Sequence, residues 1–306
     1  MFKEYAQVRE YLRGIGAVAG DPLSMPLAQA REQQENYFRL SGGQAPAVPR
    51  SDRLSMDGPH GPIGLDIVYP RVTKAPLPMV LFVRGAGWWA GSLDSHAATV
   101  RRIAMQTDCA VCAVDFRRTP EHRYPVQVDE VLATINWLRE QAKNRTRGLL
   151  GDKLVLFGES AGATLCLSAA QFMRDRGYPP AAGLVLFYSN AGGPQPTARE
   201  YSRWVWQQYL GDLGPEQARS AIPFRGDLSG LPPAWLGVGE DDPLKSDNER
   251  LAAQLAAAGN TASLTAYPKL PHGFVMLSGW LEPAASALRD ACAAIGEFAG
   301  WKPPIR

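Results

Sequence analysis

Ser160 is the residue best placed for nucleophilic chemistry in this 306-residue sequence, because it stands at the centre of a G-x-S-x-G pattern. The apolar run Leu154–Phe157 leads directly into that pattern, and the alanine-rich segment 163–173 follows it. A strand, a tight turn and a helix in this order are typical of a nucleophile elbow, which projects the serine hydroxyl from a strained backbone position. The helix dipole there favours developing negative charge. The alternative is a structural turn in which Ser160 only caps a helix.

A serine hydroxyl becomes a good nucleophile only when a base removes its proton and an acid orients that base. His272 is the expected base, because it follows the last predicted strand in a loop where Gly273 gives the backbone freedom. The other histidines all precede Ser160 in the chain, and they are His60, His96 and His122. A surface histidine without a chemical role is the alternative interpretation of His272.

The expected acid is Asp242, which leaves the end of the preceding predicted strand. Pro243 biases the residue before it toward an extended conformation, so Asp242 stays outside the following helix and near the carboxyl edge of the sheet. Glu240 and Asp241 precede it directly. Asp247, a candidate helix N-cap, is the weaker rival.

Acyl-transfer chemistry at a serine also needs N–H donors for the negatively charged oxygen of the tetrahedral intermediate. The strand predicted at Met79–Val83 ends in the small-residue loop 84–89, which we expect at the same edge of the sheet. The natural donors are the backbone N–H groups of Gly85, Ala86 and Ala161. Taken alone, this loop is equally compatible with an ordinary strand-to-helix turn.

From residue 79 onward, short apolar runs alternate with segments of helical periodicity. This alternation predicts an α/β fold with a mostly parallel central sheet flanked by helices. All the expected strands but the last are apolar at nearly every position, as strands covered on both faces should be. They are Met79–Val83, Ala110–Val114, Leu154–Phe157, Leu184–Phe187, Trp235–Val238 and Ser263–Tyr267. Helical periodicity is found within Val128–Leu138, Asn248–Ala258 and Leu288–Ile295.

We expect an N-terminal helical cap segment over residues 1–50, followed by one catalytic domain over residues 51–306. Residues 51–69 predict a hairpin that leads into the sheet, because a Gly/Pro-rich turn separates two alternating stretches. Residues 190–232 interrupt the α/β rhythm with an aromatic helix, and we interpret them as a second cap insertion.

Composition excludes several classes of function. A net charge of +2 is too balanced for a nucleic-acid partner. No apolar run approaches the roughly 18 residues of a membrane span, and no signal-peptide pattern follows the N-terminus, so we expect a cytoplasmic protein without a membrane partner. Four cysteines are too few for a disulfide framework, and we interpret Cys109 and Cys112 as part of a buried strand. We expect no metal and no cofactor, and a homodimer is left open.

The blocks described above resemble, from about residue 60 to the C-terminus, the bacterial hormone-sensitive lipase-like carboxylesterases of the α/β-hydrolase fold. The family's His-Gly-Gly-Gly-Phe/Trp and Gly-Ser blocks correspond to residues 84–88 and 91–96. Its Asp-Tyr-Arg-Leu-Ala-Pro-Glu-His block corresponds to residues 115–122, a segment that supports the site in the family. Its triad blocks appear in the Ser, Asp, His order of α/β-hydrolases, at residues 158–162, 242–244 and 271–274.

The resemblance implies a serine carboxylester hydrolase (EC 3.1.1) that takes a small-molecule ester or lactone through a Ser160–His272–Asp242 triad and an acyl-enzyme. Brief, aromatic cap segments favour short-chain or compact esters. The aromatic residues expected to shape the substrate pocket, each with core packing as its alternative, are Trp88, Trp89, Tyr188, Trp204 and Trp206. A lactonase or amidase with the same triad is an alternative, as is a non-catalytic small-ligand-binding protein on the same fold.

Two positions depart from the family pattern. Arg84 replaces the histidine of the oxyanion loop, and Ala86 replaces its middle glycine. An alanine held at positive φ costs roughly 1 kcal/mol, although its N–H stays available. Arg84 either braces the loop or binds the carboxylate of an acidic substrate, and a solvent-facing arginine is the third interpretation. Bracing is favoured, because the family's residue at this position serves the loop.

Overall fold

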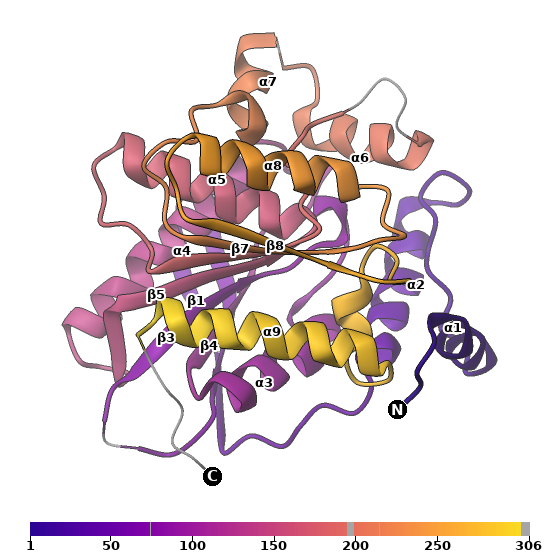
Figure 1. Ribbon diagram of the computed structural model, residues 1–306, viewed down its shortest axis with the longest axis horizontal. Coiled ribbons are helices and arrows are strands. Elements are labelled where there is room, and N and C mark those ends of the chain that lie inside the picture. Colours follow the sequence, from indigo (N-terminus) through magenta and orange to yellow (C-terminus); the bar gives the residue numbers. More distant parts are fainter. Residues whose placement is uncertain (74, 195–198, 214, 301–306) are drawn as a thin grey trace.

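The computed structural model describes residues 1–73, 75–194, 199–213 and 215–300. Within them, eight strands form one sheet in the order β1-β2-β4-β3-β5-β6-β7-β8 (Figure 1). The first two strands and the pair β2–β4 are antiparallel, whereas all other neighbours are parallel. The strands are β1 (Arg50–Gly58), β2 (Gly61–Tyr69), β3 (Leu77–Val83), β4 (Ala110–Asp115), β5 (Leu149–Glu159), β6 (Gly183–Phe187), β7 (Ala234–Gly239) and β8 (Ala262–Tyr267).

The mostly parallel sheet is confirmed, and each predicted strand lies within an observed one. Strands β3, β6 and β7 are buried at every position, because helices cover both faces of the sheet. Strand β5 begins at Leu149, earlier than its apolar run. Its first half carries polar residues and is only partly buried, so hydrophobicity alone did not reveal it.

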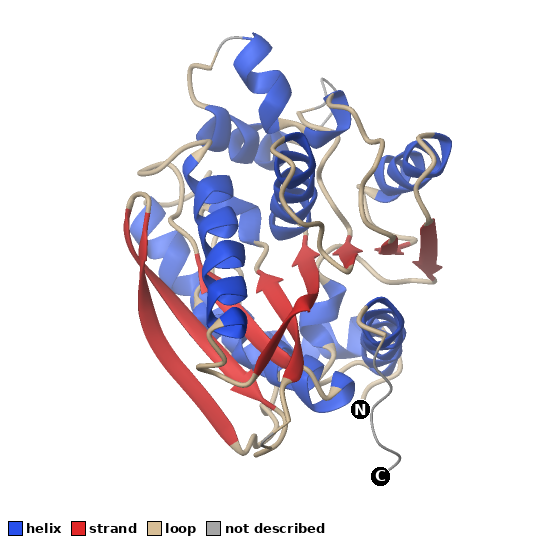
Figure 2. Cartoon of the chain, turned by 90° about the vertical axis from the view of Figure 1, so that its left-hand side faces the viewer, coloured by secondary structure: helices blue, strands red, loops and turns tan. Residues whose placement is uncertain are grey.

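Helices lie on both faces of the twisted sheet (Figures 1 and 2). On one face lie α3 (Leu93–Thr107) and α9 (Glu282–Phe298), and on the other α4 (Val126–Lys143), α5 (Ala161–Asp175) and α8 (Lys245–Ala257). Buried apolar side chains form a separate core layer on each face. Each fully buried Val, Leu or Phe contributes about 1.5–3 kcal/mol to these layers.

The N-terminal segment contains α1 (Tyr5–Gly14) and α2 (Leu27–Ser41), both within the helical segment expected over residues 1–50. The later insertion contains α6 (Glu200–Leu210), α7 (Pro215–Ala221) and the 3₁₀ turn η2 (Pro223–Arg225), while residues 195–198 and 214 lie outside the described residues. Helix α2 packs on α3, and α6 packs on the 3₁₀ turn η1 (Ala86–Trp88). The division into cap segments and one catalytic domain stays a prediction.

The carboxyl ends of the parallel strands meet at one edge of the sheet. The loops that follow β3, β5, β7 and β8 therefore come together there, which is where open α/β sheets hold their ligands. A further 3₁₀ turn, η3 (Phe274–Leu277), completes the loop after β8. Among the described residues, no helix is both long and apolar enough to cross a membrane.

Candidate active site

Ser160 occupies a sharp turn between β5 and α5. Its backbone has φ 51° and ψ −120°, a strained combination for a residue with a side chain. The turn is anchored by the Ser160 N–H, which donates to the carbonyl of Phe187 at 2.9 Å. A Cβ at Gly162 would lie 2.0 Å from the Val83 carbonyl oxygen, so only glycine lets α5 approach the end of β3 this closely. The predicted strand–turn–helix arrangement is present.

The hydroxyl of Ser160, the ring of His272 and the carboxylate of Asp242 form a continuous chain of hydrogen bonds. Ser160 Oγ lies 2.9 Å from His272 Nε2, and His272 Nδ1 lies 2.9 Å from Asp242 Oδ2. The Asp242 side chain is fully buried, whereas 36% of the His272 side chain is exposed. The structure therefore brings together the three residues that the sequence predicted, with the ring open toward solvent.

The pKa of His272 is set by opposing effects. Burial lowers it, but the attraction and hydrogen bond of the Asp242 carboxylate and the charge of Glu159 outweigh burial, so the net pKa is raised. The ring of Tyr188 packs edge-on against His272, with 4.8 Å between ring centres. The imidazole is thus held in orientation and made a stronger base than an ordinary histidine.

The rival acids lie elsewhere. Glu240 and Asp241 are exposed. Asp247 is not the N-cap of α8, as the sequence suggested, but lies in its first turn. The reason is that Asp242 Oδ1 accepts the N–H of Leu244 at 2.8 Å, so the helix begins at Lys245.

Three consecutive residues of the oxyanion loop have left-handed backbones, with φ 66° at Ala86, 57° at Gly87 and 63° at Trp88. No hydrogen bond within the described residues occupies the N–H groups of Ala86, Gly87 and Ala161. Gly85 was an expected donor, but its N–H points to the Glu159 carboxylate at 3.1 Å and is not available. The free donors at this edge are therefore those of Ala86, Gly87 and Ala161.

A buried carboxylate, Glu159, ties the oxyanion loop to the nucleophile turn. Besides the Gly85 N–H, it contacts His96 Nε2 at 3.1 Å and accepts the Tyr188 hydroxyl at 2.9 Å. Burial alone raises the pKa of Glu159, but His96, Tyr188 and the Gly85 N–H together outweigh it, and the pKa is lowered. Sequence reasoning passed over Glu159 and Gly87, although both lie inside the two motifs it singled out.

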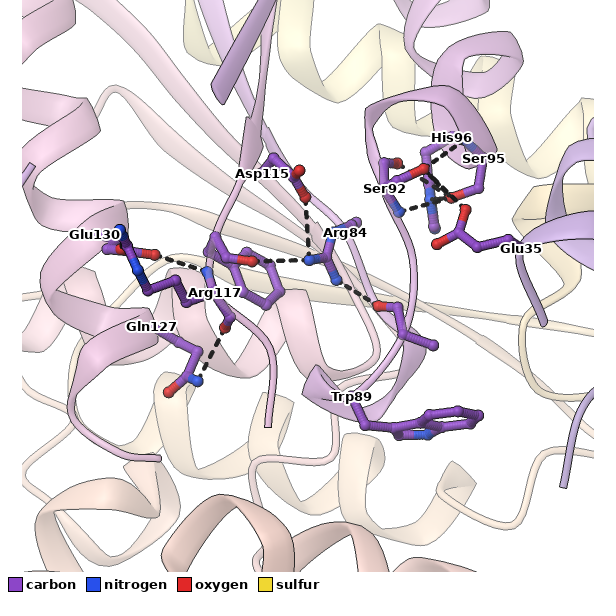
Figure 3. A network of polar contacts seen from close by, with 12 residues as sticks. Glu35, Arg84, Trp89, Ser92, Ser95, His96, Asp115, Arg117, Gln127 and Glu130 are labelled. Carbon is purple, nitrogen blue, oxygen red and sulfur yellow. Dashed lines mark hydrogen bonds and ion pairs between the residues drawn. The ribbon is translucent and has the colours of Figure 1, made fainter. Parts of the chain in front are cut away.

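Arg84 is buried, and its side chain lies between Asp115 and the chain segment that leads to Ser92 (Figure 3). Its guanidinium donates to the carbonyl oxygens of Ala90 at 2.5 Å and Phe116 at 2.9 Å. It also pairs with Asp115 at 3.3 Å and lies over the Phe116 ring. The side chain is 2% exposed, so Arg84 braces the loop and is not available to bind substrate, which corrects its place among the substrate-binding residues.

Comparisons with known proteins agree with this geometry. A family model described as the alpha/beta hydrolase fold matches residues 80–276. The chain belongs to the α/β-hydrolase family. Esterase LipI of Mycobacterium tuberculosis is 33% identical over 262 residues, covering 79% of this chain and 80% of the relative. Carboxylesterase NlhH of the same organism is 32% identical over 255 residues, covering 76% and 77%.

Solved structures of esterases are similar to nearly the whole of this chain. The hyperthermophilic esterase from the archaeon Pyrobaculum calidifontis has a TM-score of 0.87 at 28% identity, covering 97% of this chain and 99% of that one. A second, the thermophilic carboxylesterase EstE1 from a metagenomic library, has a TM-score of 0.84 at 28% identity, covering 92% and 99%. The resemblance to α/β-hydrolase esterases is thereby confirmed.

Most aromatic residues expected to line the substrate pocket are packed inside this hydrolase instead. Trp88, Tyr188 and Trp206 are 0–1% exposed, because Trp88 and Trp206 pack on each other and Tyr188 packs behind His272. Trp89 is also buried, and its Nε1 donates to the Tyr201 hydroxyl. Of this set only Trp204 keeps a partly exposed side chain, so the core interpretation holds for the others.

The remaining candidate groups are either at the surface or deeply buried. His60 lies at the surface beside Asp129, and His122 is exposed. Burial raises the pKa of Cys109 to about 11, and it raises the pKa of Cys112 as well, so neither thiol ionises readily. The described part of the chain contains no group of three or more His, Cys, Asp or Glu side chains that could hold a metal ion.

We predict that Arg84→Ala lowers kcat on every ester alike, by roughly tenfold or more, because a loosened loop weakens stabilisation of the oxyanion. Steady-state kinetics on a neutral ester and a matched carboxylate-bearing ester measure this effect. A rise in KM confined to the acidic ester would show that Arg84 meets the substrate after all.

Proposed function

We propose that this carboxylester hydrolase works through an acyl-enzyme formed on Ser160, with His272 as the general base and Asp242 as the acid that orients it. The observation that carries the proposal is the unbroken relay from Ser160 through His272 to buried Asp242, with both links at 2.9 Å. The unoccupied N–H groups of Ala86, Gly87 and Ala161 lie at the same edge of the sheet and supply the oxyanion hole.

The steps follow from this arrangement. Asp242 accepts the Nδ1–H of His272, which leaves Nε2 free to take the Ser160 proton as Oγ attacks the ester carbonyl carbon. The carbonyl oxygen becomes an oxyanion held by the N–H donors. When the C–O bond breaks, Nε2 gives its proton to the departing alcohol. A water molecule then attacks the acyl carbon, its proton passes through Nε2, and Ser160 is released with the free acid.

Within the fold, we propose that the protein is one of the hormone-sensitive lipase-like enzymes. Two sequence blocks that resemble this family, residues 84–88 and 115–122, support the proposal, because the hydrogen bond from Arg84 to the Phe116 carbonyl joins them in the structure. A cytoplasmic location is part of the proposal, supported by the four buried, free cysteines of the described chain, because thiols stay reduced in that compartment.

We predict that Ser160→Ala abolishes turnover of p-nitrophenyl acetate and leaves the fold intact, since loss of a triad nucleophile costs on the order of 10⁶-fold in kcat. Asp242→Asn is expected to cost on the order of 10⁴-fold. The matched control is Asp241→Asn, which changes an exposed neighbour. Near wild-type activity in the serine variant, or a larger loss from the control than from Asp242→Asn, would contradict the mechanism.

The pH dependence of kcat/KM reports the protonation of His272. Only the neutral imidazole accepts the serine proton, so activity rises with pH through the raised pKa of His272, above the ordinary histidine value. In Asp242→Asn the attraction that raises this pKa is lost and burial remains, so the acidic limb moves to lower pH. Residual activity measured from pH 4 to 9 tests this, and a limb that stays in place would refute the assignment.

We propose that the substrates are short-chain or compact esters, because α6 packs directly on the oxyanion loop and aromatic side chains fill the space between them. A p-nitrophenyl series from acetyl to palmitoyl is expected to give its highest kcat/KM at the short end. Parallel assays on a lactone and an anilide separate esterase from lactonase and amidase activity. Fastest turnover of long-chain emulsions would contradict the proposal.

A further inference from the structure

The oxyanion loop has a strained backbone with few hydrogen bonds to hold it. The Ala86 carbonyl accepts the N–H groups of Trp89 and Ala90 at 3.2 and 3.3 Å, and the Trp88 carbonyl accepts that of Thr119 at 3.1 Å. Ala86 and Trp88 have positive φ angles of 66° and 63°, on either side of Gly87 at 57°. A left-handed conformation costs a residue with a side chain roughly 1–2 kcal/mol. Such a run persists only where the surrounding structure imposes it, so another element must supply the contacts that keep the N–H donors in place.

Arg84 begins this loop and reaches only its far end, through the Ala90 carbonyl, while its bond to the Phe116 carbonyl ties it to the segment after β4. Two of the left-handed residues, Gly87 and Trp88, contact α6, and the turn also packs on α5. The Trp88 ring stacks on Tyr209, with 4.0 Å between ring centres and 8° between planes, and meets Trp206 edge-on at 4.9 Å. A Cβ added to Gly87 would lie 3.0 Å from Val205, so α6 also presses on the loop backbone.

Val205, Trp206 and Tyr209 lie on one face of α6, because residues at i, i+1 and i+4 share a side of a helix. Tyr209 is itself fixed, since its carbonyl accepts the Tyr124 N–H at 3.0 Å. All three are at most 4% exposed. This face of α6 therefore contacts the loop without being able to touch a substrate.

No side-chain hydrogen bond joins Trp88 to Tyr209. The Tyr209 hydroxyl and Trp88 Nε1 are both buried, and neither has a hydrogen-bond partner among the described residues. Leaving a buried polar atom unpaired costs about 1–3 kcal/mol. The Tyr209 side chain is thus held against the loop by the packing of its ring, and its hydroxyl adds no hydrogen bond to the arrangement.

We propose that α6 clamps the oxyanion loop in its left-handed conformation, with Tyr209 as the positioning residue that acts through the Trp88 ring. This inference rests on the proposed function of the loop as an oxyanion hole. When the stack is lost, the strained residues relax toward negative φ and the Ala86 and Gly87 N–H groups turn away from the oxyanion. The clamp therefore serves the transition state and not the binding of the ester.

The test is Tyr209→Leu, compared with Tyr209→Phe, which keeps the ring. We expect the leucine variant to lower kcat on p-nitrophenyl acetate by about 10–100-fold, short of the loss of a whole donor, with KM changed less than about threefold. The phenylalanine variant restores most of kcat. Titration of Ser160 with a fluorophosphonate counts the folded enzyme, so that partial unfolding is not mistaken for slow catalysis.

A double-mutant cycle with Ala86→Gly separates the clamp from general destabilisation. Glycine adopts positive φ without strain, so Tyr209→Leu should cost several-fold less in kcat in the Ala86→Gly background than in the wild-type background. The matched control is Leu255→Ala, a fully buried change in α8, which should lower stability and leave kcat per titrated site unchanged. Where Tyr209→Leu does not fold, Trp206→Leu takes its place in the cycle.

The outcomes are distinguishable. A wild-type protein without ester turnover removes the proposed function and the clamp together. An active wild type in which Tyr209→Leu keeps full kcat, raises KM instead, or loses the same factor in both backgrounds removes the clamp and leaves the proposed function standing.

Discussion

The buried carboxylate of Glu159 is the interaction on which the candidate site depends. It directly precedes Ser160, and it accepts the Gly85 N–H and the Tyr188 hydroxyl while it contacts His96. A charge in the protein interior is tolerated only when its hydrogen-bonding capacity is filled. Because the partners come from the β3 loop, helix α3 and the end of β6, satisfying this one charge fixes the nucleophile turn relative to the oxyanion loop.

A second buried charge, the Arg84 guanidinium, supports the same loop. Arg84 departs from the histidine of the family pattern that the sequence resembles, and its guanidinium reaches two backbone carbonyls and Asp115. Arginine offers five donors in a rigid plane, so it can brace the loop and the segment 115–122 at the same time. Burial lowers the pKa of Arg84, and Asp115 opposes that effect, which is the pattern of a structural cation.

The packing of helix α6 on the loop completes the arrangement. Trp88 and Tyr209 come from segments more than a hundred residues apart, and their rings are stacked at 4.0 Å. Helix α6 is thus part of the support of the oxyanion loop, together with Glu159 and Arg84. The loop is strained by its own backbone angles and held by Glu159, Arg84 and α6, which is how strained conformations persist at functional sites.

The sequence by itself determined the order of the parallel strands along the chain and the three residues of the relay. Continuous apolar runs identify strands that are covered on both faces. Parallel strands must bring their carboxyl ends to one edge of the sheet, so the sequence alone placed Ser160, Asp242 and His272 together. Pro243 was enough to choose Asp242, because its effect on the preceding backbone is local.

Only the tertiary structure decided which donors are free and which aromatic rings are core. Gly85 and Gly87 look alike in sequence, and they differ because the Glu159 carboxylate lies next to one and not the other. Trp88 and Trp206 read equally well as pocket or core, and their burial follows from α6 packing on the loop. These outcomes depend on contacts between distant segments, which the local pattern of a sequence does not encode.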